Sequence, residues 1–373
     1  MIWKNRRLSY FAGCDYFRLA SHPEVINAVK VGLAKYGLNV AASRLTTGHH
    51  ALYDRLEKAL ADFFGAPAAL LVGNGYATNL IVAQGLRGDY SDVLIDARAH
   101  ASLRDAADIL RCPITEFKHR DLNDLVRRLK GKSRPLVLTD GVFSQDGQIA
   151  PLREYLEVLP RGGMILLDDA HSAGVLGANG RGTLEFTKTP RSRIIQTVTL
   201  SKAFGVYGGA ILCGRAMREK IISGSRMFAG NTPLPLPLAN AALASIGILR
   251  RDSSLRSRLN ENVKYIKDAL RSIGMTLPET PAPILAIIPR NRGQTQALRK
   301  LLLAHDVFPS FIRYPGGPES GYFRFVISSE HSRGQLDSLI ASLTIQFSKN
   351  CNREKDSPAG RRRVRPRRSR SPT

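Results

Sequence analysis

Two runs in the middle of the chain, residues 164–171 and 194–202, limit most strongly what this sequence can fold into. Each begins as a largely apolar stretch of strand length and then breaks into polar and small residues. Such runs are typical of parallel strands that are buried on both faces of a sheet. Because ligands bind beyond the carboxyl ends of the strands in an open α/β sheet, we expect Asp168, His171 and Lys202 to meet at one edge of the fold.

The side chains at the ends of these runs match the needs of one cofactor. A single lysine just past a strand is more often an ordinary surface residue. Lys202, however, lies between the small residues Ser201 and Ala203 and is accompanied by the carboxylate of Asp168. Pyridoxal phosphate (PLP) needs a lysine amine for attachment and a carboxylate that keeps its ring nitrogen protonated. The pair therefore predicts a PLP enzyme.

From Leu8 to Leu343 the sequence resembles the α-oxoamine synthases, PLP enzymes with the aspartate-aminotransferase fold (fold type I). Besides the two central runs, the motifs Asp15-Tyr16, ASRLTTG at 42–48 and DGVFSQDG at 140–147 carry the resemblance. It implies an α/β fold whose large PLP-binding domain has a mostly parallel seven-stranded sheet flanked by helices, with a smaller C-terminal α+β domain. The expected parts are an N-terminal arm and first helix (1–35), the large domain (36–248), the small domain (249–349) and a disordered basic tail (350–373).

The resemblance also implies which residues hold the cofactor. Gly75 and Tyr76 follow a strand-like run and open a helix, whose first turn can bind a phosphate, although a Gly-x-Gly turn alone is more often an ordinary β–α connection. His100 is expected to lie flat on the cofactor ring, and His171 to bond the ring hydroxyl. The catalytic candidates are Lys202, His100, Asp168 and His171, and the cofactor-binding candidates are Gly75, Tyr76, His100, Ser144, Asp168, His171, Thr199, Lys202 and Thr232.

On the substrate side, the resemblance assigns an arginine to the substrate carboxylate. Arg324 and Arg313, in or beside strand-like runs, are the candidates, although either could instead form a surface ion pair. Two positions depart from the family pattern. Asp140 replaces a glutamate, and Gly316-Gly317 replaces Thr-Val, so we expect a changed acyl pocket.

Two loops, 43–48 and 228–235, resemble parts that reach the neighbouring subunit in the family, which implies a homodimer with shared active sites. One threonine of the second loop contacts the partner's phosphate in the family. Alignment on Leu234-Pro235 selects Thr232 for this role, whereas alignment on Phe228 selects Gly230. Thr232 is favoured because it retains the hydroxyl.

The chain is strongly basic, with a net charge of +24, and the Arg-rich tail accounts for only part of the excess. The charge could attract a CoA or acyl-carrier-protein substrate, or nucleic acid weakly through the tail, or could serve only solvation. No apolar run is long enough to span a membrane, and no signal peptide is recognisable. The four cysteines lack metal-ligand spacing. We therefore expect a cytoplasmic enzyme without a metal.

The resemblance implies an acyltransferase that condenses an amino acid, L-alanine above all, with a pimeloyl-CoA-like thioester. Loss of carbon dioxide would give an α-oxoamine such as 8-amino-7-oxononanoate for biotin synthesis. Another fold type I reaction stays open, either transamination or chemistry like that of 2-amino-3-ketobutyrate CoA ligase. So does polyanion binding on an inactive scaffold, although the joint presence of Lys202, Asp168, His171 and His100 argues against it.

Overall fold

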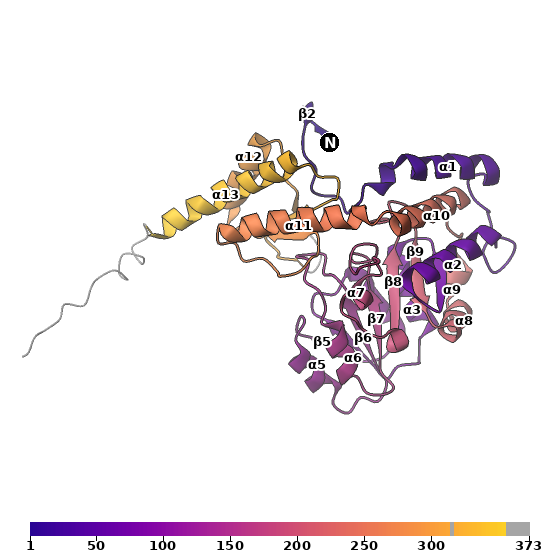
Figure 1. Ribbon diagram of the computed structural model, residues 1–373. Helices are drawn as coiled ribbons and strands as arrows, with labels where there is room; N and C mark the ends of the chain where they lie inside the picture. Colours follow the sequence, from indigo (N-terminus) through magenta and orange to yellow (C-terminus); the bar gives the residue numbers. More distant parts are fainter. Residues whose placement is uncertain (314–316, 356–373) are drawn as a thin grey trace, which may run out of the picture.

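The computed structural model describes residues 1–313 and 317–355. Its centre is a seven-stranded sheet, called here the large sheet, with the strand order β3-β9-β8-β7-β6-β4-β5. Only β9 runs antiparallel to its neighbours, so the predicted mostly parallel sheet flanked by helices is confirmed (Figure 1). The strands are β3 Ala68–Val72, β4 Asp92–Asp96, β5 Ile114–Phe117, β6 Pro135–Asp140, β7 Met164–Asp168, β8 Ile194–Thr199 and β9 Gly209–Cys213.

The central strands are apolar throughout because both faces of the large sheet are covered. In β7, for example, Leu166 packs into a cluster with helices α3, α4 and α8, while Ile165 and Leu167 pack into another with α5 and α6. Strands of this kind lack the alternation of a half-exposed strand. The helices around this sheet are α1 Pro23–Tyr36, α2 Ala51–Phe64, α3 Gly75–Gly85, α4 Ala101–Leu110, α5 Leu122–Leu129, α6 Leu152–Val158, α7 Thr183–Phe186, α8 Arg215–Gly224, α9 Arg226–Ala229 and α10 Leu236–Arg251.

The C-terminal part forms a second, three-stranded antiparallel sheet, called here the small sheet, with the order β10-β12-β11. Its strands and helices lie at the upper left of Figure 1, beside the large sheet. The elements are α11 Ser254–Ser272, β10 Ile284–Ile287, α12 Arg292–Ala304, β11 Phe311–Ile312, β12 Tyr322–Val326 and α13 Arg333–Lys355.

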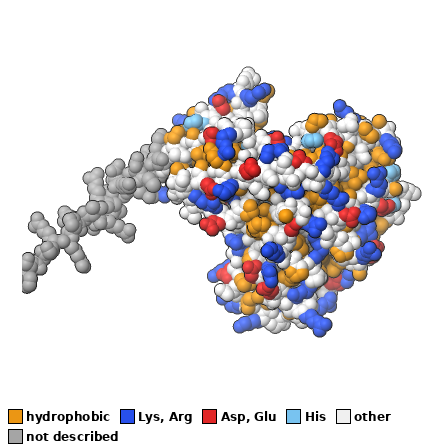
Figure 2. Space-filling model, in the orientation of Figure 1, with side chains coloured by type: hydrophobic (Ala, Val, Ile, Leu, Met, Phe, Trp, Pro, Cys, Tyr) orange, Lys and Arg blue, Asp and Glu red, His pale blue; other side chains and the backbone are white. Residues whose placement is uncertain are grey.

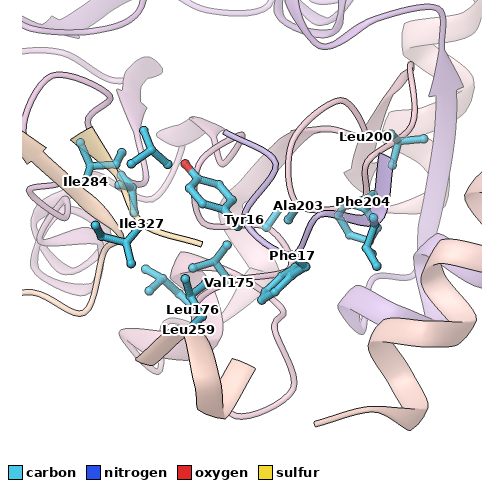
Figure 3. Packing of buried hydrophobic residues seen from close by; sticks show 14 of the residues in the cluster. Tyr16, Phe17, Val175, Leu176, Leu200, Ala203, Phe204, Leu259, Ile284 and Ile327 are labelled. Atoms are coloured by element: carbon cyan, nitrogen blue, oxygen red, sulfur yellow. The ribbon is translucent and has the colours of Figure 1, made fainter. Parts of the chain in front are cut away.

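The N-terminal segment joins the two sheets. After a short hairpin of β1 (Ile2–Trp3) and β2 (Arg6–Arg7), residues 8–20, called here the strap, run along the small sheet towards the lysine loop that comes after β8. In Figure 3, Tyr16 and Phe17 of the strap lie between Ile284 and Ile327 on one side and Ala203 and Phe204 on the other. All of these residues belong to one buried cluster, so the strap is part of the core.

The last helix extends further than the sequence predicted. The tail was expected to begin at residue 350, but α13 continues to Lys355. No glycine or proline, the residues that break helices, occurs between 350 and 355. The rest of the predicted tail, 356–373, lies outside the described residues, and so does Gly316.

The surface is basic over a wide area. Figure 2 shows Lys and Arg side chains spread over the visible face instead of gathered in one patch. Across the two described ranges of the chain, no helix combines the length and the apolar character that a membrane span requires.

Candidate active site

A cavity of about 260 Å³ lies beyond the carboxyl ends of β6, β7 and β8. Hollows of 480 and 720 Å³ elsewhere contain none of the residues predicted for the site. The small cavity, by contrast, brings together seven of the nine cofactor-binding candidates. It is lined by Asn74, Gly75, Tyr76, His100, Ser102, Asp140, Asp168, Ala170, His171, Thr199, Ser201 and Lys202.

The carboxylate of Asp168 is held in place by a buried amide that the sequence did not reveal. Asn79 of α3 donates from Nδ2 to Asp168 Oδ2 at 2.7 Å and to Ser102 Oγ at 2.9 Å. Its Oδ1 accepts a hydrogen bond from Thr197 Oγ1 at 2.7 Å. Because these donors and acceptors are all buried, the direction of the Asp168 carboxylate is fixed. Asn79 is one of several polar residues of α3, so the sequence pattern did not single it out.

The hydrogen bonds of His100 determine its tautomer. The backbone N–H of Ser102 donates to His100 Nδ1 at 3.3 Å, and Ser102 Oγ lies 2.8 Å from the same nitrogen. A backbone amide can only donate, so Nδ1 carries no proton and the neutral ring carries it on Nε2. Burial lowers the pKa of His100, which keeps the ring neutral, although the Asp168 charge opposes the shift.

Lys202 is half-buried in a loop that turns away from the end of β8. Burial lowers the pKa of its ammonium group, while Cys14 and the carboxylates of Asp168 and Asp140 oppose the shift. Asp140 accepts a hydrogen bond from the His100 backbone at 2.8 Å. Its pKa is raised well above 3.8 by burial and by the neighbouring Asp168. A lysine with a lowered pKa is suited to act as a base near neutral pH.

The buried side chain of Asp169 anchors the loop that carries His171. This fully buried carboxylate accepts hydrogen bonds from the backbone and hydroxyl of Thr183 at 3.0 and 2.6 Å and from Gln196 Nε2 at 2.6 Å. The two adjacent aspartates therefore differ in function, since Asp168 lines the cavity and Asp169 anchors the loop. Burial, and next the charge of Lys202, lowers the pKa of His171 well below 6.5.

The first turn of α3, which also lines the cavity, packs tightly on Thr199 at the end of β8. Asn74 caps the helix by accepting a hydrogen bond from Ala77 N at 2.9 Å. A Cβ added to Gly75 would lie 2.6 Å from Thr199 Cβ, so only glycine fits there. A helix N-terminus next to a hydroxyl offers amide donors and a positive dipole end to an anion.

This arrangement fits PLP. A helix N-terminus, an oriented carboxylate and a lysine amine with a lowered pKa all line the same cavity. The described residues contain no group of three His, Cys, Asp or Glu side chains that could hold a metal ion.

Four predicted residues are not among the described residues that line the cavity. Ser144 is buried nearby, and its carbonyl accepts a hydrogen bond from Arg324 at 3.4 Å. The charge of Arg324 helps to lower the pKa values of His171 and Lys202. Arg313 is exposed after β11. Thr232 is exposed in a loop next to Arg44 and Gly73, away from the Lys202 of its own chain, and Gly230 ends α9.

The sequence matches a known family model over nearly its whole length. The model described as aminotransferase class I and II matches residues 15–343. The 8-amino-7-oxononanoate synthase of Thioalkalivibrio sulfidiphilus is 35% identical over 344 residues, which cover 91% of this chain and 88% of that protein. The protein of the same name from Ectopseudomonas mendocina is 36% identical over 343 residues, again covering 91% and 88%.

Solved structures show the same likeness. A serine palmitoyltransferase variant from S. paucimobilis, with PLP and myriocin bound, superposes with a TM-score of 0.87 and 28% identity. The match covers 93% of this chain and 89% of that one. The 8-amino-7-oxononanoate synthase of Francisella tularensis superposes with a TM-score of 0.81 and 26% identity, covering 93% and 98%.

Proposed function

The chain belongs to the aminotransferase class I and II family, and from this membership we propose that it is a PLP-dependent acyltransferase of the 8-amino-7-oxononanoate synthase type. The relatives named above support this reaction over transamination. The observation that carries the proposal is the joint lining of one cavity by Lys202, Asp168, His100 and His171. The substrates are an amino acid, L-alanine first, and a pimeloyl-CoA-like thioester.

Different residues of the cavity lining would hold different parts of the cofactor. The first turn of α3, with Gly75 and Tyr76, and the Thr199 hydroxyl would bind the phosphate. Asp168 would hold a proton at the ring nitrogen, and Lys202 is the amine for attachment. When bound, PLP supplies an electron-withdrawing ring that stabilises negative charge at the α-carbon of an attached amino acid.

Residues of the chain then transfer the proton and bind the substrate. Lys202, as a neutral amine, takes the α-proton, for which its lowered pKa prepares it. The Nε2–H of His100 is available as a hydrogen-bond donor. Arg324 is the candidate residue for binding the substrate carboxylate. The α-carbon bonds the acyl carbon of the thioester, the C–S bond breaks, and the thiol leaves. Loss of carbon dioxide and protonation of the same carbon give the α-oxoamine.

A homodimer with shared sites completes the proposal. The exposed position of Thr232, outside the cavity of its own chain, suits contact with a neighbouring subunit's phosphate. The domain limits proposed for the chain are those expected from the sequence, except that α13 continues past residue 349 to Lys355; α10 links the large and small domains. Activity on a soluble CoA or carrier-protein thioester would fit a cytoplasmic protein.

The function is tested with a matrix of amino acids and acyl thioesters, in which free CoA and carbon dioxide are measured together. We expect equal release of both with L-alanine and a dicarboxylic C7 thioester, and release at background level with the Lys202→Ala variant. Borohydride reduction of the loaded wild type should fix the cofactor at Lys202, as mapped by mass spectrometry. Conversion of the amino acid to a keto acid without any thioester would instead establish an aminotransferase.

A further inference from the structure

Tyr16 of the strap contacts the candidate site but has no part in the function proposed above. Its hydroxyl lies 2.7 Å from His171 Nδ1, and both side chains are buried. The two residues are 155 positions apart in the chain. The rings meet at an interplanar angle of 67° with their centroids 6.5 Å apart, so the contact between them is made at the hydroxyl.

The strap holds the Tyr16 ring rigidly. The carbonyl of Phe11 accepts a hydrogen bond from Val326 N at 2.7 Å, and the carbonyl of Tyr16 accepts one from Ser329 N at 2.9 Å. Further along, Gly205 of the lysine loop packs so closely on the strap that an added Cβ would lie 2.2 Å from Ala20 N. The strap is therefore fixed to the small sheet at one end and to the lysine loop at the other, as the packing in Figure 3 illustrates.

The direction of the Tyr16–His171 hydrogen bond is set by the acceptors that surround the hydroxyl. A buried hydroxyl requires an acceptor for its proton. The Tyr16 hydroxyl lies 2.7 Å from the imidazole nitrogen of His171, and the thiol of Cys14 also acts on it. The imidazole nitrogen is the stronger acceptor and the thiol a weak one. The tyrosine therefore donates to Nδ1.

We propose that Tyr16 is a positioning residue that holds His171 in the tautomer with a bare Nδ1 and a protonated Nε2. This role rests on the proposed function, because the protonated Nε2 would be the donor to the ring hydroxyl of the cofactor. Without the Tyr16 proton, either nitrogen of His171 could carry the hydrogen, and the ring could turn. The small sheet thereby contributes to the site through the strap as well as through Arg324.

Several charged or titratable groups surround His171 and must be considered together when its titration is interpreted. Tyr16 keeps its proton, because burial raises its pKa well above 10. A donor to Nδ1 favours the neutral ring, in the same direction as burial. The other groups near His171 are Cys14 from the strap, His100 just before α4, Asp140 at the end of β6, Asp168 at the end of β7, Lys202 after β8 and Arg324 from β12.

The tautomer is tested by NMR on cofactor-free protein labelled with ¹⁵N-histidine, with His171→Gln used to assign the His171 signals. We expect a wild-type spectrum in which only Nε2 of His171 is protonated. In Tyr16→Phe, the His171 signals should show exchange between tautomers, and the titration midpoint should rise by about one pH unit, the typical effect of one lost hydrogen bond.

Tyr90→Phe is the matched control. It also removes a buried hydroxyl with a partner, Met164 Sδ at 3.0 Å, but at the opposite edge of the large sheet. It should leave the His171 signals unchanged. A wild-type His171 protonated at Nδ1 would overturn the proposal even if Tyr16→Phe did not fold, and so would a Tyr16→Phe spectrum identical to wild type. Because no substrate is present, failure of the acyltransferase assay would leave these spectra interpretable.

Discussion

At the scale of single residues, backbone amides decide how the histidines of this protein act. In His100, the amide of Ser102 donates to Nδ1. His331 repeats the arrangement, since Ser328 N donates to its Nδ1 at 3.0 Å and its Nε2 lies 3.1 Å from the carbonyl of Tyr10. A neutral ring satisfies both contacts of His331, whereas a second proton would displace the Ser328 bond. Protonation of His331 would therefore remove the Ser328 contact, while the hydrogen bond from Nε2 to Tyr10 of the strap would remain.

Acid should therefore weaken the protein through His331. Burial lowers its folded-state pKa from 6.5 to about 4, so the unfolded chain binds more protons between these values. The free energy of unfolding should fall as the pH drops below 6.5, with the loss complete near pH 4 and worth at most about 3 kcal/mol. Urea unfolding at a series of pH values measures this loss of unfolding free energy.

The control for this prediction is His331→Gln, which should lose that part of the pH dependence. His49→Gln, a change at a half-exposed histidine paired with Asp54, should keep it. An identical pH dependence in wild type and His331→Gln would contradict the prediction.

At the scale of elements, the turn between β3 and α3 is shaped for an anion. Gly75→Ala would bring a methyl group to 2.6 Å from Thr199 Cβ, and this contact would separate the helix end from the end of β8. We expect the dissociation constant of PLP to rise at least about tenfold, the effect of one lost charge-assisted hydrogen bond. Titration of the cofactor-free protein with PLP, followed by absorbance, measures the change.

Gly214→Ala provides the comparison for this substitution. Gly214 precedes α8, has a negative φ and has no atom within 4 Å of an added Cβ. The affinity of the Gly214→Ala variant for PLP should equal that of wild type. If Gly75→Ala also bound PLP normally, the phosphate would have to lie elsewhere.

At the scale of the whole molecule, α1 and the loop after it expose several large apolar side chains. Ile26, Val31 and Leu33 of α1 are 40%, 51% and 45% exposed, and Leu38 and Leu45 beyond it are 73% and 51% exposed. Apolar residues gathered on one surface mark an interface. Because Leu45 belongs to the 43–48 loop, which is expected at a subunit interface, a second copy of the chain is the favoured partner.

Subunit mixing tests the shared site. Lys202→Ala and Thr232→Asp should each be nearly inactive alone, the second because a carboxylate would repel the phosphate bound by the neighbouring subunit. A mixture at equal concentrations, exchanged through mild denaturation, should recover up to about a quarter of wild-type activity, because half of the dimers are hybrids with one intact site. Hybrids proved by mass spectrometry that remain inactive would contradict this prediction.

The order of residues along the chain determined the large sheet and the central features of the site. The continuous apolar runs around Asp168 and Lys202 required strands covered on both faces, and parallel strands bring the residues at their carboxyl ends to one edge of the sheet. These are local patterns, and the large sheet that they predicted is confirmed. The same logic placed Gly75 at a β–α turn.

Tertiary structure alone decided which side chains orient these groups. Asn79 and Asp168 are 89 positions apart, and Tyr16 and His171 are 155 apart. No periodicity relates such pairs, because their distance depends on how helices and the strap pack on the sheet. For the same reason the sequence could not place Arg313 and Thr232, which the packing leaves exposed, or extend α13 to Lys355. Local patterns determine where the strands end, whereas packing between segments far apart in the chain determines which side chains contact the residues at those ends.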